Sequence, residues 1–233
     1  MQLFYTETPL SGTCLLDPAE SKHLIRVLRF KKGDEVLVTD GTGKLGRGVI
    51  TKPDINGCMI DIREISEGPD KRNYYLHIAI SPLTNSERLD WFIEKAVEIG
   101  VDEISLVVSD HSVRKRANTA RLRRIAISAM KQSLRTRLTR INEPVNFHDF
   151  IRSPLTEYKI ITYCGAAEKD YLHLMCSSGE KYTIMIGPEG DFSEPEVEAS
   201  CNAGFRVASL GTGRLRTETA GIVACHSIYL INL

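Results

Sequence analysis

A strand–loop–helix pattern occurs twice within residues 184–230, and this repetition constrains the fold more than any other feature of the sequence. In the first copy an apolar run ends at Gly187, and a glycine-containing loop leads to a helix whose predicted N-cap is Ser193. In the second copy an apolar run ends at Gly211, and a similar loop leads to an apolar helix over residues 222–230. Two such loops at the carboxyl ends of neighbouring strands form a ligand-binding crevice in an open α/β sheet.

The charge of the first loop limits what this crevice can hold. A phosphate-binding loop presents backbone N–H groups with a Lys or Arg, whereas this loop contains Glu189 and Asp191 and no cation. A cationic ligand fits better, and S-adenosylmethionine carries a sulfonium. Its adenine and ribose would need apolar cover, for which Ile186, Leu210 and Leu215 are candidates. The alternative is that both loops are ordinary turns in which glycine permits a positive φ.

Strands and helices alternate from about residue 74 onward. A capping-box pattern at residues 84–87 opens a predicted helix that ends at Gly100, and residues 119–135 form a second predicted helix. The strands are predicted at residues 74–80, 104–108, 160–163, 183–186 and 205–210. Residues 104–108 are apolar except for Ser105, as expected of a strand whose two faces are both covered. This part of the chain therefore has the pattern of an α/β fold with a mainly parallel sheet.

The first 68 residues have a different pattern, in which short strands alternate with turns. A capping-box pattern from Asp17 to Glu20 opens one short helix, which would place Arg26 and Arg29 on one face. A small β-barrel fits this region, and its basic helix is either an RNA contact or a solubilising surface. Residues 67–73 are polar and rich in turn formers, so they are the predicted linker between a domain at 1–70 and a domain at 71–233.

Positive charge is concentrated in one segment although the formal net charge of the chain is zero. Residues 111–142 contain ten Lys or Arg and no Asp or Glu. A basic ridge along the helix at 119–135 is predicted to contact an RNA backbone; the other interpretation is a solvated face. With an upstream arginine, the candidate RNA-binding residues of this segment are Arg114, Arg121, Arg124, Lys131 and Arg135.

The six cysteines are widely spaced and show no C-x-x-C pair, and the six histidines show no metal-ligand spacing. Reduced, buried thiols in a cytoplasmic protein without a metal are expected. The sequence has no signal peptide and no apolar run of membrane-spanning length, so no membrane partner is expected.

The two loop motifs carry a resemblance to a known family. Ile186-Gly-Pro-Glu-Gly-Asp-Phe and Leu210-Gly-Thr-Gly-Arg-Leu-Arg-Thr-Glu-Thr-Ala resemble the paired motifs of the RsmE-type 16S ribosomal RNA uridine N3-methyltransferases, members of the SPOUT superfamily. Stretches that begin at His23, Glu94 and Gln132 match the family too, so the resemblance covers essentially the whole chain. The sequence departs from the family where a glycine usually stands in place of Asp191 and of Leu134, and an acid in place of Lys131.

The resemblance implies a PUA-like N-terminal domain, a SPOUT domain with a C-terminal trefoil knot, and a homodimer. It implies S-adenosyl-L-methionine as cofactor and 16S ribosomal RNA of the small ribosomal subunit as partner. The cofactor-binding residues that it implies are Tyr163, Ile186, Gly187, Pro188, Glu189, Gly190, Leu210, Gly211, Leu215, Arg216, Thr217 and Ala220.

Methylation of uridine N3 requires an unpaired or flipped base and the loss of the N3 proton. Arg216 is the candidate for stabilising the developing anion at the uracil carbonyls. Glu218 would orient Arg216 or accept a proton, or would instead cap the last helix together with Thr217. Glu189 would bind the cofactor or close its own loop.

Two other functions remain open at this stage. A non-catalytic ribosome-assembly factor would bind RNA without a cofactor, and a related methyltransferase would act on transfer RNA or on another ribosomal position. The long second motif favours a catalytic protein over the assembly factor.

Overall fold

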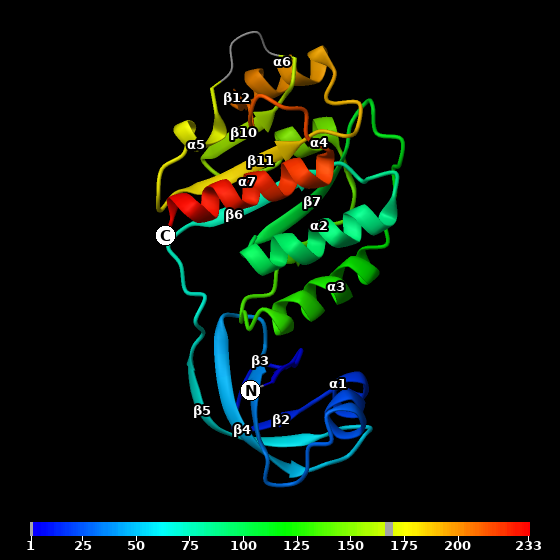
Figure 1. Cartoon of the computed structure of the whole chain (residues 1–233), viewed down its shortest axis with the longest axis vertical. Helices are drawn as coiled ribbons and strands as arrows, with labels where there is room; N and C mark the ends of the chain where they lie inside the picture. The colour runs from blue at the N-terminus through cyan, green and yellow to red at the C-terminus, as the bar shows by residue number, and fades with distance from the viewer. Residues whose placement is uncertain (1, 166–169) are drawn as a thin grey trace. The chain divides into compact units, whose positions relative to one another are not determined.

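The computed structural model describes residues 2–165 and 170–233, which form two compact units (Figure 1). Met1–Arg72 and Ile127–Leu138 make up the first unit, and Asn73–Ala126 and Thr139–Leu233 make up the second. The first unit is therefore completed by a segment that lies far along the chain. None of the helices in the described parts of the chain is long and apolar enough to cross a bilayer.

The first unit contains a five-stranded sheet with the order β1-β3-β4-β5-β2. Its strands are β1 (Leu3–Tyr5), β2 (Thr13–Leu15), β3 (Glu35–Thr39), β4 (Lys44–Lys52) and β5 (Met59–Glu67). β1 runs parallel to β3, and the other neighbours are antiparallel. β1 and β2 are the edge strands, and no ladder joins them in the described residues. The predicted small β-barrel is thus, in the described residues, a five-stranded sheet with no ladder between its edge strands.

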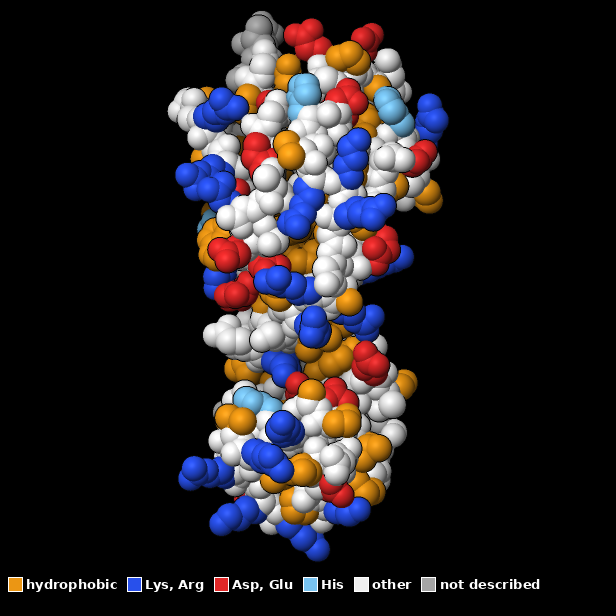
Figure 2. Space-filling model, turned by 90° about the vertical axis from the view of Figure 1, so that its right-hand side faces the viewer, with side chains coloured by type: hydrophobic (Ala, Val, Ile, Leu, Met, Phe, Trp, Pro, Cys, Tyr) orange, Lys and Arg blue, Asp and Glu red, His pale blue; other side chains and the backbone are white. Residues whose placement is uncertain are grey.

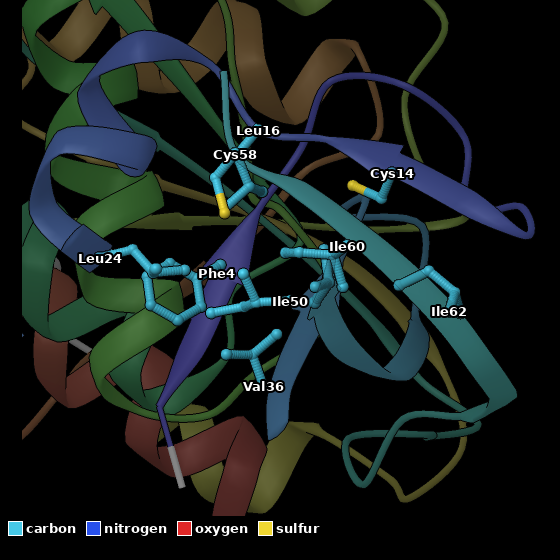
Figure 3. Close-up of a cluster of buried hydrophobic side chains, with 10 residues drawn as sticks. Phe4, Cys14, Leu16, Leu24, Val36, Ile50, Cys58, Ile60 and Ile62 are labelled. Atoms are coloured by element: carbon cyan, nitrogen blue, oxygen red, sulfur yellow. The ribbon is translucent and has the colours of Figure 1, made fainter. Parts of the chain in front are cut away.

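The core of the first unit follows from alternation along these strands (Figure 3). On β3, Val36 and Val38 are buried, and they pack with Ile50 of β4 and Ile60 of β5. Inward-facing side chains two residues apart are what a sheet with one covered face requires. The other members of this buried cluster are Phe4, Cys14, Leu16, Leu24, Cys58 and Ile62.

The helix of the first unit is shorter than expected. α1 (Pro18–Lys22) begins at the predicted cap, where the Asp17 carboxylate accepts hydrogen bonds from the N–H groups of Ala19 and Glu20. A short π-helical segment (His23–Val27) follows, and Arg29 then takes a left-handed φ of 59°. The expectation that Arg26 and Arg29 share a helix face is wrong, because the helix ends between them.

The second unit contains a parallel sheet with the order β12-β10-β11-β6-β7-β8, which confirms the predicted mainly parallel α/β domain. A further short strand, β9, pairs with β7. The strands are β6 (Tyr75–Ile80), β7 (Glu103–Val108), β8 (Arg140–Ile141), β9 (Val145–Asn146), β10 (Tyr158–Thr162), β11 (Lys181–Ile186) and β12 (Arg206–Ala208).

Helices cover both faces of this sheet, as its buried and mainly apolar strands require. α7 (Thr217–Ile231) packs against α2 (Ser86–Ile99), β6 and β11 (Figure 1). On the other face, α4 (Phe147–Arg152) and α6 (Glu194–Asn202) contribute to a cluster with Ala79, Val107 and Met185 of the strands. α5 (Leu172–Met175) is a short helix that contacts α7.

Three helix boundaries differ from the sequence expectation. Asn85 rather than Thr84 caps α2, because its side chain accepts a hydrogen bond from the Glu87 N–H. α3 (Thr119–Gln132) ends before Arg135. Arg135 was expected to be part of this helix but lies beyond its end. α7 begins five residues before the predicted start at 222, which shortens the loop that precedes it. The predicted cap of α6 is confirmed, since Ser193 and Glu196 form a capping box.

Candidate active site

A cavity of 540 Å³ lies at the carboxyl ends of β10, β11 and β12. This volume falls within the roughly 300–1,000 Å³ typical of small-molecule sites. The β11 and β12 loops, the first turn of α7 and Arg88 of α2 line it, so the two repeated loops meet as predicted. Every proposed cofactor-binding residue except Gly190 lines the cavity: Tyr163, Ile186, Gly187, Pro188, Glu189, Leu210, Gly211, Leu215, Arg216, Thr217 and Ala220.

The β11 loop is held in shape by Asp191. This residue has a left-handed φ of 63°, a conformation that aspartate tolerates better than most side chains. Its carboxylate accepts hydrogen bonds from the backbone N–H groups of Cys164 and Phe192, both at 2.9 Å. The carboxylate therefore ties the β10 loop to the β11 loop, which a glycine in the same position could not do.

Glu189 and Gly190 fix the outer side of this loop. One carboxylate oxygen of Glu189 accepts a hydrogen bond from the Thr84 N–H at 3.1 Å, just before α2. The Gly190 carbonyl lies 3.1 Å from Nδ1 of His111, which follows β7. Gly190 does not line the cavity. The Glu189 carboxylate thus accepts a backbone N–H bond as one alternative predicted, but from the segment before α2 rather than from its own loop.

The β12 loop approaches the cavity through Gly211. This glycine has a φ of 149°, and a Cβ built on it would meet no atom within 4 Å. Ser209 fixes the turn, because its hydroxyl donates to the Gly211 carbonyl at 2.9 Å and accepts from the Gly211 N–H at 3.3 Å. The backbone of Gly211 is therefore open to a ligand in the cavity.

The N-terminus of α7 places one cation and one carboxylate at the cavity. Arg216 is the N-cap and makes no side-chain capping bond, and Glu218 lies in the first turn. A cation is unfavourable at the positive end of a helix, whereas a carboxylate is stabilised there. Neither Thr217 nor Glu218 is the cap, so the alternative assignment of these two residues as the cap of the last helix does not hold.

Arg88 is a cavity residue that the sequence analysis did not identify. Its Nε lies 3.6 Å from Oε1 of Glu218, whose side chain is 9% exposed. Nothing in the spacing of the sequence connects a residue near the start of α2 with one at the start of α7, so only the packing of the two helices brings them together.

The basic residues do not form the continuous ridge that we expected. Arg114 and Arg124 are exposed, but Arg121 pairs with Asp90. Lys131 pairs with Glu20 within the first unit and its side chain is only 19% exposed. On the face in Figure 2, Lys and Arg side chains are separated by acidic and uncharged ones.

The cysteines form no disulfide in the described residues, and the expectation that they are buried is wrong for Cys164 and Cys201, which are exposed. Among residues 2–165 and 170–233, no group of three or more His, Cys, Asp or Glu side chains is arranged to hold a metal ion.

Comparison with known proteins defines the class of this protein. Residues 70–229 match the RNA methyltransferase domain family, and residues 16–60 match the PUA domain of RNA methyltransferases. The protein is therefore an RNA methyltransferase with an N-terminal PUA domain.

Full-length relatives narrow this class. The sequence is 31% identical to ribosomal RNA small subunit methyltransferase E of Aquifex aeolicus over 99% of each chain. It is 32% identical to the protein of that name from Buchnera aphidicola, over 88% of this chain and 83% of the relative. The chain belongs to the family of ribosomal RNA small subunit methyltransferase E, which confirms the resemblance of the two loop motifs.

Solved structures agree with this assignment. A probable rRNA-methyltransferase from Porphyromonas gingivalis matches with a TM-score of 0.91 and 40% identity, covering 100% of this chain and 98% of that chain. Ribosomal RNA small subunit methyltransferase E from Neisseria gonorrhoeae, solved bound to S-adenosyl methionine, matches with a TM-score of 0.88 and 27% identity at the same coverage.

Proposed function

We propose that this protein transfers the methyl group of S-adenosylmethionine to N3 of a uridine in 16S ribosomal RNA, uridine 1498 in the usual numbering. The observation that carries the proposal is the cavity at the carboxyl ends of β10, β11 and β12, in which both family motifs meet. The Neisseria relative with this fold was solved with S-adenosyl methionine bound, and the relatives' names specify the small-subunit RNA.

The cavity residues fit S-adenosylmethionine by charge and by shape. The carboxylates of Glu189, Asp191 and Glu218 line it and can face a positive sulfonium. Arg88, Arg214 and Arg216 line it too and can face the ligand's carboxylate. Ile186, Leu210 and Leu215 supply apolar cover for an adenine, and the open backbone at Gly211 allows close approach. When bound, this cofactor supplies an electrophilic methyl group on sulfur. We assign cofactor binding to the predicted residues that line the cavity, and a loop-supporting role to Gly190.

The chemistry at N3 requires the removal of one proton and the stabilisation of negative charge on the uracil carbonyls. We assign the removal of the N3 proton to Glu218, whose carboxylate accepts it as the new N–C bond forms and the C–S bond breaks. We assign the stabilisation of the negative charge to Arg216, because a cation at an uncapped helix N-terminus gains nothing from the helix itself. The released electron pair stays on sulfur, which leaves a neutral thioether.

The RNA would be held by basic residues of both units. We propose that the domain of residues 1–70 binds RNA through Arg26 and Arg29, which are both exposed, and that the domain of residues 71–233 carries out catalysis. Phosphate contacts fix position and add salt-dependent affinity. Within the second domain the contacts would come from Arg114, Arg121 and Arg124, with further contributions from Lys131 and Arg135. A homodimer, a C-terminal trefoil knot and a cytoplasmic location complete the proposal.

Mapping of methylated nucleotides tests the function. Small subunits from cells that lack the protein should gain one N3-methyluridine in 16S RNA when treated with the purified protein and S-adenosylmethionine. Free 16S RNA and transfer RNA are the comparison substrates. Methylation at a different ribosomal position, or of transfer RNA alone, would contradict the assignment.

A further inference from the structure

Glu218 is a buried carboxylate with one ion-pair partner on another helix. The residue is 7% exposed, and its Oε1 lies 3.6 Å from the Arg88 Nε. Burying a carboxylate is costly unless an opposite charge or hydrogen bonds compensate for the lost hydration. The first turn of α7 supplies part of that compensation through its helix dipole, and Arg88 supplies a full charge.

The two helices are packed so that this pair forms at the cavity. Four residues after Arg88, Phe92 of α2 lies on the same helix face, and Gly221 lies three residues after Glu218 on α7. A Cβ on Gly221 would come within 2.5 Å of the Phe92 ring, so α7 lies unusually close to α2 there. About one helical turn before this contact on each helix, at the cavity, the same packing places Arg88 of α2 opposite Glu218 of α7.

An ordinary surface ion pair does not describe this contact. Exposed pairs contribute only about 0–1 kcal/mol, because water solvates both partners. Here the two partners differ in solvent exposure, since the Arg88 side chain is 41% exposed whereas that of Glu218 is 9% exposed. Arg88 can therefore lose its partner at little cost, but Glu218 cannot.

We propose that Arg88 is a positioning residue that holds the Glu218 carboxylate in place at the cavity, where it accepts the N3 proton. This role rests on the function proposed above. The other ionisable and charged groups that line the cavity with Glu218 are Tyr163, Cys164, Glu189, Asp191, Arg214 and Arg216. Arg214 donates to the Glu189 carbonyl at 3.4 Å, and Glu189 accepts from Thr84, so these two have other partners.

Removing the charge of Arg88 should release the Glu218 carboxylate from its position. Arg88→Met keeps most of the aliphatic stem and removes the cation, whereas Arg88→Lys keeps the charge. The Glu218 side chain should therefore shift in Arg88→Met and stay largely in place in Arg88→Lys. Arg206→Met is the control, because Arg206 is an exposed arginine paired with Asp170 at the amino end of β12.

Carbon-13 NMR of glutamate-labelled protein reports the surroundings of the Glu218 carboxylate without substrate, with its signal assigned from Glu218→Gln. An unchanged Glu218 carboxyl chemical shift in a folded Arg88→Met variant would overturn the proposal. The measurement needs no methyl transfer, so its result stands whether or not the proposed reaction is correct.

Single-turnover methylation of small subunits then tests the consequence for catalysis. Arg88→Met should slow methyl transfer by about tenfold or more with little change in the affinity for S-adenosylmethionine, and Arg88→Lys should restore most of the rate. In the Glu218→Gln background the Arg88→Met change should have no further effect on the rate. Equal losses in Arg88→Met and Arg88→Lys, or additive losses in the double variant, would show that Arg88 acts independently of Glu218.

Discussion

Gly221 of α7 lies against Phe92 of α2, so closely that a Cβ on the glycine would be 2.5 Å from the Cε2 atom of the ring. Phe92 is fully buried and cannot move aside. The absence of a side chain at Gly221 thus sets the distance between the helices that carry Arg88 and Glu218. The contact explains why a helix interior contains glycine, which costs about 1 kcal/mol relative to alanine.

Gly221→Ala is expected to destabilise the protein although alanine favours helices. Overpacking of a tight core typically costs 1–3 kcal/mol, about as much as or more than the gain in helix propensity. Chemical denaturation should show a lower midpoint, and Phe92→Leu in the same chain should recover part of it. Gly213→Ala is the matched control, because a Cβ there meets no atom within 4 Å. Equal stability of Gly221→Ala and wild type would refute the tight contact.

Gly211→Val should prevent binding of S-adenosylmethionine. The φ of 149° is rarely adopted by L residues with side chains, and a branched one would also stand next to the open backbone that a ligand approaches. Isothermal titration calorimetry should detect no binding by a variant that remains folded in circular dichroism. Unaltered affinity would remove the cofactor from this part of the cavity.

Arg216→Lys should slow methyl transfer about a hundredfold, or roughly 3 kcal/mol, with a much smaller change in cofactor affinity. Lysine keeps the charge but loses the planar fork that can donate to two acceptors together. A contact made chiefly in the transition state affects the rate and not ground-state binding. Single-turnover rates on small subunits, with cofactor affinity measured separately, test this. A wild-type rate would assign Arg216 to structure or cofactor binding.

The exposed arginines should contribute to RNA affinity more than the paired one. Arg114→Ala and Arg124→Ala are each expected to reduce the log–log salt slope of RNA binding by about 1. Arg121→Ala should have a smaller effect, since Arg121 must leave Asp90 before it can bind a phosphate. Filter binding at several salt concentrations measures the slopes, and Arg206→Ala is the control. Identical slopes in all variants would mean that this surface is only solvated.

His77 should make the second unit sensitive to mild acid. It is buried in β6, and its Nε2 lies 2.8 Å from the Ser105 hydroxyl. Burial lowers the pKa of His77; nearby Glu103 opposes this shift, and Arg140 adds to it. The folded protein therefore keeps the imidazole neutral, whereas the unfolded chain takes up a proton near pH 6.5.

This difference reduces stability below pH 6.5, by at most about 1.4 kcal/mol per pH unit. The pKa of Glu103 is also lowered: burial raises it, but hydrogen bonds from Tyr75 and Asn142 outweigh that effect. Its contribution is present above its ordinary pKa and is lost as the pH falls through the lower folded value. Denaturation at pH 7 and pH 5.5 should show a drop in wild type that shrinks in His77→Gln. An equal drop in both would refute the role of His77.

Local sequence signals determined most of the second unit. The mainly apolar runs at residues 104–108 and 183–186 are all of β7 except its first residue and the end of β11, because a strand buried on both faces is mostly apolar. The capping box at Ser193 specified the start of α6, since its hydrogen bonds join residues three apart. The two glycine loops predicted the site for the same reason: each loop follows directly from its own strand.

Local sequence patterns gave wrong or incomplete predictions where a contact with a residue far away in the sequence determined the structure. Glu20 has the spacing of a capping box, but its carboxylate accepts from the Tyr5 N–H and pairs with Lys131. Leu134 has a positive φ of 56°, which a leucine at this position does not predict. Lys131 belongs to a segment that joins the first unit from far along the chain.

The pair of Arg88 and Glu218 was decided by tertiary structure alone. Each residue is ordinary in its own stretch of sequence: one lies near the start of α2, the other in the first turn of α7. Their meeting depends on the approach of Gly221 to Phe92, which in turn depends on how two helices pack on one sheet. Backbone conformation and capping follow from neighbours in sequence, whereas a charge pair between helices follows from packing, which involves residues from the whole unit.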